Sequence, residues 1–68
     1  MQLQAINSSK IEAVGYDNNG MILRLKFKYI TCDYYEVPSE VYRNFMAASS
    51  KNGYFTKHIK NSYRYCIV

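Results

Sequence analysis

The chain has 68 residues, which is enough for a single small domain with one core and too short for two, so we treat residues 1–68 as one domain. Apolar residues make up 49% of it, which argues against disorder, and no apolar run is long enough to span a membrane. The net charge of +4 favours an anionic partner, while a chain with one His has little room for both a core and a catalytic pocket.

The first half of the chain predicts an antiparallel sheet. Residues 11–16 are β-prone, and Asn19 with Gly20 predicts a tight hairpin turn because this pair readily adopts positive φ angles. An apolar row then alternates with a row of cations, which predicts a half-buried strand. The apolar row is Leu23, Leu25, Phe27 and Tyr29, and the cations are Arg24, Lys26 and Lys28. These cations form either a solvated outer face or a basic strip that extends the C-terminal charge.

Residues 30–37 predict a third strand, although the turn before it lacks a Gly. Pro38 ends this strand and suits the first position of a helix. Residues 38–49 then predict an amphipathic helix that packs on the sheet with Val41, Phe45 and Ala48.

Residues 49–53 are expected to break that helix, with Gly53 in the left-handed conformation. A second short helix follows, with Phe55 and Ile59 on one side. Residues 63–68 form either an edge strand or an extended tail packed on the helices. The expected fold is α+β, with a small antiparallel sheet of three strands, or four with the C-terminal one, against one or two α-helices in the order β-β-β-α-α(-β).

The positive charge is concentrated at the C-terminal end. All five acidic residues precede residue 51, so residues 1–50 are neutral, whereas residues 51–68 carry only cations. Aromatic residues lie between these cations, a pattern typical of nucleic-acid surfaces, where cations neutralise phosphates and rings stack on unpaired bases. The alternative is a solvated basic face above tyrosines that belong to the core.

Two cysteines, Cys32 and Cys66, are too few for a disulfide-dense secreted domain. Residues 1–20 also lack the apolar stretch of a signal peptide, so we expect a cytoplasmic protein. Both thiols are then expected to be small buried hydrophobes, with a disulfide between them as the alternative.

Residue types used in catalysis and metal binding are present, but not at the spacings these sites need. A Ser with His58 and Asp17 or Asp33 lacks a nucleophile-elbow pattern, and Cys32, Cys66 and His58 lack the short spacings of a zinc site. The three glycines are too far apart for a phosphate-binding loop. We therefore expect no catalytic residue, no metal and no cofactor.

Several short motifs along the chain carry a family resemblance. They are Val14-Gly15-Tyr16-Asp17, residues 23–27, residues 34–38, Val41-Tyr42, Ala48, Ser50, Gly53-Tyr54-Phe55, His58-Ile59 and Tyr63. In this order, between Ser8 and Tyr65, they resemble the KTSC domain family, which is named from the C-terminal region of some lysyl-tRNA synthetases and also occurs as short stand-alone bacterial and phage proteins. The chain departs from the family pattern at Cys32, which stands where the family has the first Tyr of a Tyr-x-Tyr motif, and in lacking a Gly before it.

The resemblance implies the same α+β fold and, because RNA binding is suggested for the family, an RNA-related role. We therefore predict a non-catalytic accessory module that binds RNA or single-stranded nucleic acid through its basic, aromatic C-terminal surface. The phosphate contacts would be Lys51, Lys57, Lys60 and Arg64, and the stacking rings Tyr34, Tyr54 and Tyr63 where exposed, with Arg24, Lys26 and Lys28 as further candidates. The alternative is a protein-interaction module or a homodimer joined by an open sheet edge, and in neither case is a membrane partner expected.

Overall fold

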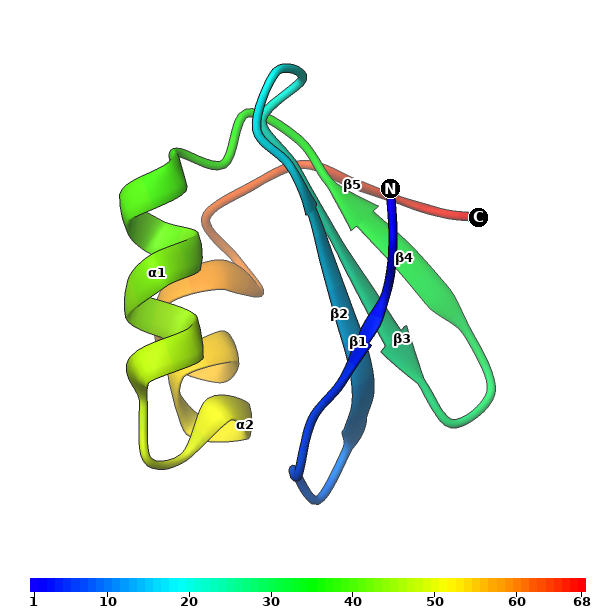
Figure 1. The fold of residues 1–68 in the computed structure, drawn as a ribbon, viewed down its shortest axis with the longest axis vertical. Helices are drawn as coiled ribbons and strands as arrows, with labels where there is room; N and C mark the ends of the chain where they lie inside the picture. Colours follow the sequence, from blue (N-terminus) through cyan, green and yellow to red (C-terminus); the bar gives the residue numbers. More distant parts are fainter.

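A computed structural model describes all of residues 1–68 as a five-stranded antiparallel sheet with every helical segment on one face (Figure 1). The strands lie side by side in chain order, and the helical segments are inserted before the last strand. The elements are β1 (Gln4–Ala5), β2 (Ile11–Asp17), β3 (Ile22–Phe27), β4 (Thr31–Tyr34), α1 (Ser39–Ala47), α2 (Lys51–Tyr54), the π-helical turn η1 (Phe55–Ile59) and β5 (Tyr65–Ile67).

The α+β class and the antiparallel sheet are confirmed, but the sheet has five strands. The C-terminal residues do form an edge strand, because Tyr65 pairs with Tyr34 and Cys66 with Asp33. At the opposite edge lies β1, which is only two residues long and has no alternating pattern that could have predicted it. The third predicted strand is shorter than expected, since β4 ends at Tyr34 and Glu36 takes a positive φ of 58°.

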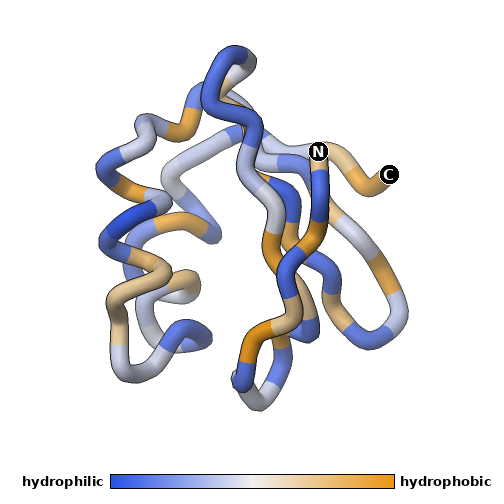
Figure 2. The backbone as a smooth tube through the Cα atoms, viewed as in Figure 1, coloured by the Kyte–Doolittle hydropathy of each residue, from blue (hydrophilic) through white to orange (hydrophobic).

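The core lies between the sheet and the helical layer, and Figure 2 shows the alternation of polar and apolar residues that produces it. From the helical layer, Phe45 and Ile59 are fully buried and Phe55 nearly so. Val41 is partly buried and packs against this core, as the amphipathic pattern predicts. The buried set is completed by Ile11, Val14, Leu23, Leu25, Cys32, Tyr34 and Val37.

The first hairpin differs from the tight turn that the sequence predicts. Asp17 pairs with Ile22, which leaves a loop of four residues, and the Asp17 carboxylate accepts a hydrogen bond from the Asn19 N–H at 3.1 Å. In this longer loop the left-handed position falls on Met21, with a φ of 56°, and no glycine has a positive φ. The Asn-Gly pair therefore marks the turn correctly but does not supply its strained residue.

Both helix starts are set by caps that shift the expected boundaries. Pro38 is the extended N-cap of α1 rather than its first helical residue. Ser50 caps α2, accepting a hydrogen bond at its Oγ from the Gly53 N–H at 3.1 Å, so Gly53 lies inside the helix instead of breaking it. A Cβ at Gly53 would sit 2.9 Å from the Ser50 Oγ, which gives this glycine a packing reason.

The two cysteines are free thiols on different faces of the sheet. Cys32 is buried as expected, but Cys66 is exposed. Cys66 pairs with Asp33, the residue after Cys32, and successive side chains of a strand point to opposite faces. The expectation of two buried thiols is therefore wrong for Cys66. The alternative, a disulfide between Cys32 and Cys66, is also excluded, because the two side chains point to opposite faces of the sheet.

The positive φ at Met21 predicts a stabilising substitution. Met21→Gly should raise the free energy of unfolding by about 0.5–1 kcal/mol, because a side chain in the left-handed region is strained and glycine is not. Urea denaturation measures this change. Met21→Ala removes the same thioether but keeps the Cβ, so it should give no gain, and an equal gain in both variants would contradict the explanation.

Candidate functional site

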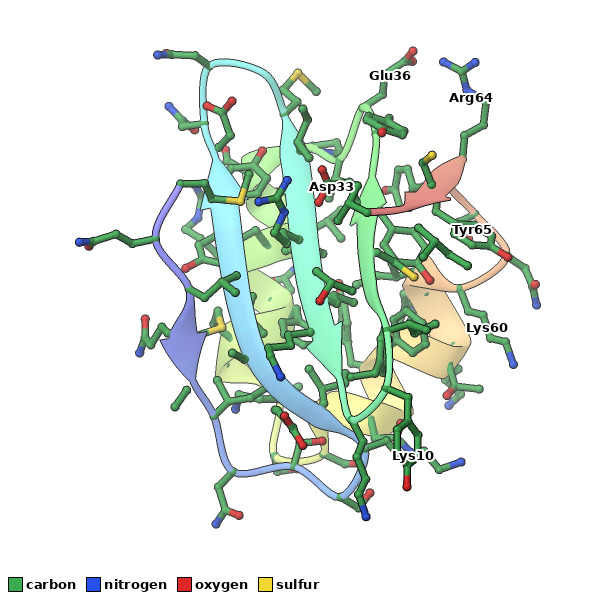
Figure 3. All side chains as sticks on the ribbon, turned by 90° about the vertical axis from the view of Figure 1, so that its right-hand side faces the viewer. Lys10, Asp33, Glu36, Lys60, Arg64 and Tyr65 are labelled. Atoms are coloured by element: carbon green, nitrogen blue, oxygen red, sulfur yellow. The ribbon has the colours of Figure 1, made fainter.

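The cations on the outer face of the sheet are neutralised by acids on neighbouring strands. Arg24 Nε and Nη2 donate to the two Asp33 oxygens at 2.7 and 2.9 Å, and these hydrogen bonds raise the pKa of the guanidinium. Lys26 Nζ lies 2.9 Å from a Glu12 oxygen. Asp33 is on the face turned to the viewer in Figure 3, opposite the helices. Arg24 and Lys26, two of the three cations that the sequence placed on this face, are therefore in ion pairs, while Lys28 lies just after the end of β3. This favours the interpretation as a solvated outer face over a basic strip.

The four C-terminal cations are not equivalent. Lys51 Nζ donates to the Ala48 carbonyl at 3.1 Å, and Arg64 Nη2 lies 3.3 Å from a Glu36 oxygen (Figure 3). Lys57 and Lys60 are exposed and form no ion pair. These two are the predicted phosphate contacts that the fold leaves free.

The three tyrosines predicted as stacking rings are not open platforms. Tyr34 is only 4% exposed, so it does not meet the condition of exposure on which its predicted stacking role depends. Tyr54 and Tyr63 are partly buried and pack against the core. The Tyr54 ring also lies tilted against the His58 ring, with centroids 4.5 Å apart. These rings belong to the core and its rim because the small domain needs them to cover its sheet.

Two other tyrosines, which the sequence analysis missed as site residues, are exposed. Tyr29 is 86% and Tyr65 56% exposed. Tyr29 continues the apolar row of β3 in the sequence, but it lies in the β3–β4 turn, which is closed by a hydrogen bond from the Phe27 N–H to the Ile30 carbonyl at 2.8 Å. Because this turn contains no glycine, no turn residue in the sequence marks the end of the row before Tyr29.

These exposed tyrosines line an apolar groove of about 510 Å³. It lies where β3, β4, η1 and β5 meet, and Tyr65 stacks there on Tyr34 with ring centroids 5.3 Å apart. Figure 3 shows Tyr65 and Lys60 at the same edge of the molecule. The groove is lined by Phe27, Tyr29, Ile30, Cys32, Tyr34, Phe55, Lys60, Asn61 and Tyr65.

Lys60 is the only charged side chain that lines this groove. Burial raises the pKa of the Cys32 thiol, so the thiol on the groove wall stays neutral and is a poor nucleophile. A second cation, Lys28, lies with its Nζ 5.5 Å from the centroid of the Tyr29 ring. The groove therefore combines an apolar floor, aromatic walls and positive charge at its rim.

Neither a cluster of metal-ligating side chains nor a helix able to cross a membrane is found in the structure. No group of three or more His, Cys, Asp or Glu side chains is placed to hold a metal ion. None of the helical segments has the length and hydropathy that a membrane span requires.

A family model and a solved structure identify the same family, and a further relative is similar over nearly its whole length. The KTSC domain model matches residues 7–63. A protein of Tsukamurella paurometabola is 41% identical over 63 residues, covering 91% of this chain and 94% of that protein. The crystal structure of a KTSC domain protein from Yersinia pestis superimposes with a TM-score of 0.96 at 34% identity, covering 98% of this chain and 96% of that one.

The buried Tyr34 predicts a loss of stability at alkaline pH. Burial raises its pKa from 10.0 to about 12, so the neutral hydroxyl is favoured in the folded protein. Its contribution to stability is complete below pH 10 and is lost as the pH rises towards about 12, by about 2–3 kcal/mol. Urea denaturation across this range, with Tyr34→Phe as the control, measures the effect. If the variant loses stability as steeply as the original protein, Tyr34 is not responsible.

Proposed function

This chain belongs to the KTSC domain family, and from that premise we propose that it is a non-catalytic module that binds RNA or single-stranded DNA at the apolar groove. The groove would take an unpaired base, and the neighbouring lysines would contact the phosphates on either side of it. This proposal keeps the nucleic-acid function expected from the sequence but moves its aromatic contacts to Tyr29 and Tyr65.

The observation that carries the proposal is the pairing of exposed rings with a single cation at one groove. A base needs a flat apolar face for stacking and a cation for its phosphate, and both are within the lining of this groove. Tyr29 is the most exposed large hydrophobic residue of the chain, so its ring is available without any rearrangement of the core.

The charge distribution supports an anionic ligand. Lys57 lies on the π-helical turn η1, Lys60 is the residue that caps its C-terminal end, and residues 51–68 contain no acidic residue. Two acids meet this segment from β4 and the loop after it: Asp33, which is held by Arg24, and Glu36, which is held by Arg64. A phosphate at the groove would therefore meet free positive charge and no carboxylate from the lining.

The surroundings of the chemically reactive groups support a binding role rather than a catalytic one. His58 is engaged with the Tyr54 ring, and the groove-lining thiol of Cys32 is held neutral by burial. We further propose a cytoplasmic location, where the exposed thiol of Cys66 would remain reduced.

Removal of the Tyr29 ring should weaken binding. Tyr29→Ala should cost about 1–3 kcal/mol of binding free energy for a single-stranded RNA, because one base loses its stacking face. Tyr29→Phe keeps that face and should bind like the original protein. Fluorescence anisotropy with a labelled oligonucleotide measures both variants, and equal affinity for all three proteins would exclude Tyr29 as a stacking ring.

Removal of the Lys60 charge should change the salt dependence. Lys60→Gln should reduce the slope of log Kobs against log salt concentration by about 0.7, the value for one phosphate contact on a single strand. Arg43→Gln removes one charge from α1 and should leave the slope unchanged. Absence of salt-sensitive binding in the original protein, at low salt, would reject the nucleic-acid function itself and favour a protein-interaction role.

A further inference from the structure

We propose that the free edge of β5 joins two copies of this chain into a symmetric dimer with one continuous sheet. This inference goes beyond nucleic-acid binding and does not depend on it. It rests on the backbone alternation of β5, on the apolar side chains at that edge and on a pairing register in which the strand complements itself.

The outer edge of β5 has backbone donors and acceptors with no backbone partner, and of these the Ile67 carbonyl accepts a hydrogen bond only from the Cys66 Sγ at 3.8 Å. The Val68 N–H donates to the Thr31 carbonyl at 2.8 Å, and the Arg64 carbonyl accepts from the Tyr35 N–H at 2.9 Å. Residues of a strand alternate in the direction of their backbone groups. The N–H and C=O groups of Arg64, Cys66 and Val68 therefore point towards β4. Those of Tyr65 and Ile67 point outwards, away from the sheet.

The side chains at this edge are also unusually apolar for a surface. Tyr65 is 56%, Ile67 60% and Val68 57% exposed. Figure 2 shows the hydrophobic colour at this end of the chain. Exposed apolar side chains also adjoin the opposite edge, where Met1 is 52% and Leu3 41% exposed, but β1 itself consists only of Gln4 and Ala5 and has no large apolar side chain within the strand.

One antiparallel register uses every outward-facing group of β5. When Cys66 lies opposite Cys66 of the second copy, Tyr65 pairs with Ile67 of the second copy and Ile67 with its Tyr65. Both pairs are hydrogen-bonded pairs, because both residues direct their backbone groups outwards. They also place an aromatic ring beside a β-branched side chain, a favourable cross-strand combination.

This self-complementarity is why we commit to a second copy as the occupant. The same three residues of each copy supply all the backbone hydrogen bonds of the pairing. No charged side chain lies within the paired segment. The flanking Arg64 falls opposite Val68 of the second copy and is already paired with Glu36. Each copy carries a net charge of +4, so salt should strengthen the dimer by screening this repulsion, whereas it weakens nucleic-acid binding.

The register also puts the exposed Cys66 thiols next to each other. In a pair without hydrogen bonds the Cα atoms are about 4.5 Å apart, within the range that a disulfide can bridge. Oxidised glutathione should convert the two thiols into one disulfide, and it is itself reduced to two molecules of glutathione. The Cys66 cross-link is therefore a direct report on the register.

Sedimentation equilibrium and cross-linking test the proposal together. The full chain should sediment as a concentration-dependent dimer, and oxidised glutathione should give a covalent dimer on a non-reducing gel. Ile67→Lys should weaken association roughly tenfold or more, by placing a charge in the paired segment. Gln4→Lys adds the same charge at the opposite edge and should associate like the original chain. Circular dichroism checks that both variants remain folded.

Cysteine variants distinguish a disulfide formed in the symmetric register from one formed by random collision of two chains. Cys66→Ser should abolish the covalent dimer and retain the reversible one, while Cys32→Ser should retain both. A chain that stays monomeric at high concentration and high salt would overturn the proposal. So would association weakened by Gln4→Lys and not by Ile67→Lys, or binding of an extended foreign peptide at β5 by a chain that does not self-associate.

Discussion

The packing of one helical layer against one face of the sheet is the interaction on which this structure depends. Phe45 and Ile59 are fully buried there, together with Leu23 and Leu25 from the central strand. A chain of 68 residues has enough large apolar side chains to cover one sheet face, and the other face must therefore be polar. The ion pair between Arg24 and the buried carboxylate of Asp33 lies on this polar face. It neutralises a cation that the sequence alone suggests is free to bind a ligand.

The groove arises because this helical layer is short. The Tyr42 ring of α1 stacks on Tyr16 of β2 at 4.7 Å, while Phe55 at the start of η1 meets the edges of Phe27 and Tyr34. Beyond Phe55 only Lys60 and Asn61 of the helical segment reach this end of β3 and β4, and apolar side chains there line an open groove. The chain then returns as β5 and places Tyr65 as the wall of that groove.

The proposed ligand site and the proposed dimer edge therefore meet at one strand. The ring of Tyr65 lines the groove and stacks on Tyr34, while the backbone of Tyr65 belongs to the free edge of β5. A dimer through this edge would bring two grooves to the middle of one long sheet. Salt should strengthen the dimer and weaken nucleic-acid binding, so the two interactions can be studied separately by changing the salt concentration.

The sequence by itself determined the parts that depend on local patterns. The alternation from Leu23 to Phe27 defines β3, Asn19 and Gly20 mark the first turn, and the spacing of Val41 and Phe45 identifies α1. The family motifs carried the resemblance that the comparisons confirmed. The unpaired Lys57 and Lys60 were also among the predicted site residues, because a run of charge is visible in a sequence.

Only the tertiary structure decided which of these residues are available. Tyr34 and Tyr29 have the same side chain, yet one is buried beneath Phe55 and the other projects from a turn. Arg64 and Lys60 both belong to the basic segment, yet only Arg64 meets an acid, Glu36, that is distant in sequence. Exposure and pairing depend on contacts between segments far apart in the chain, whereas the residue patterns of the sequence report only on neighbours, and for this reason the fold was more predictable than the site.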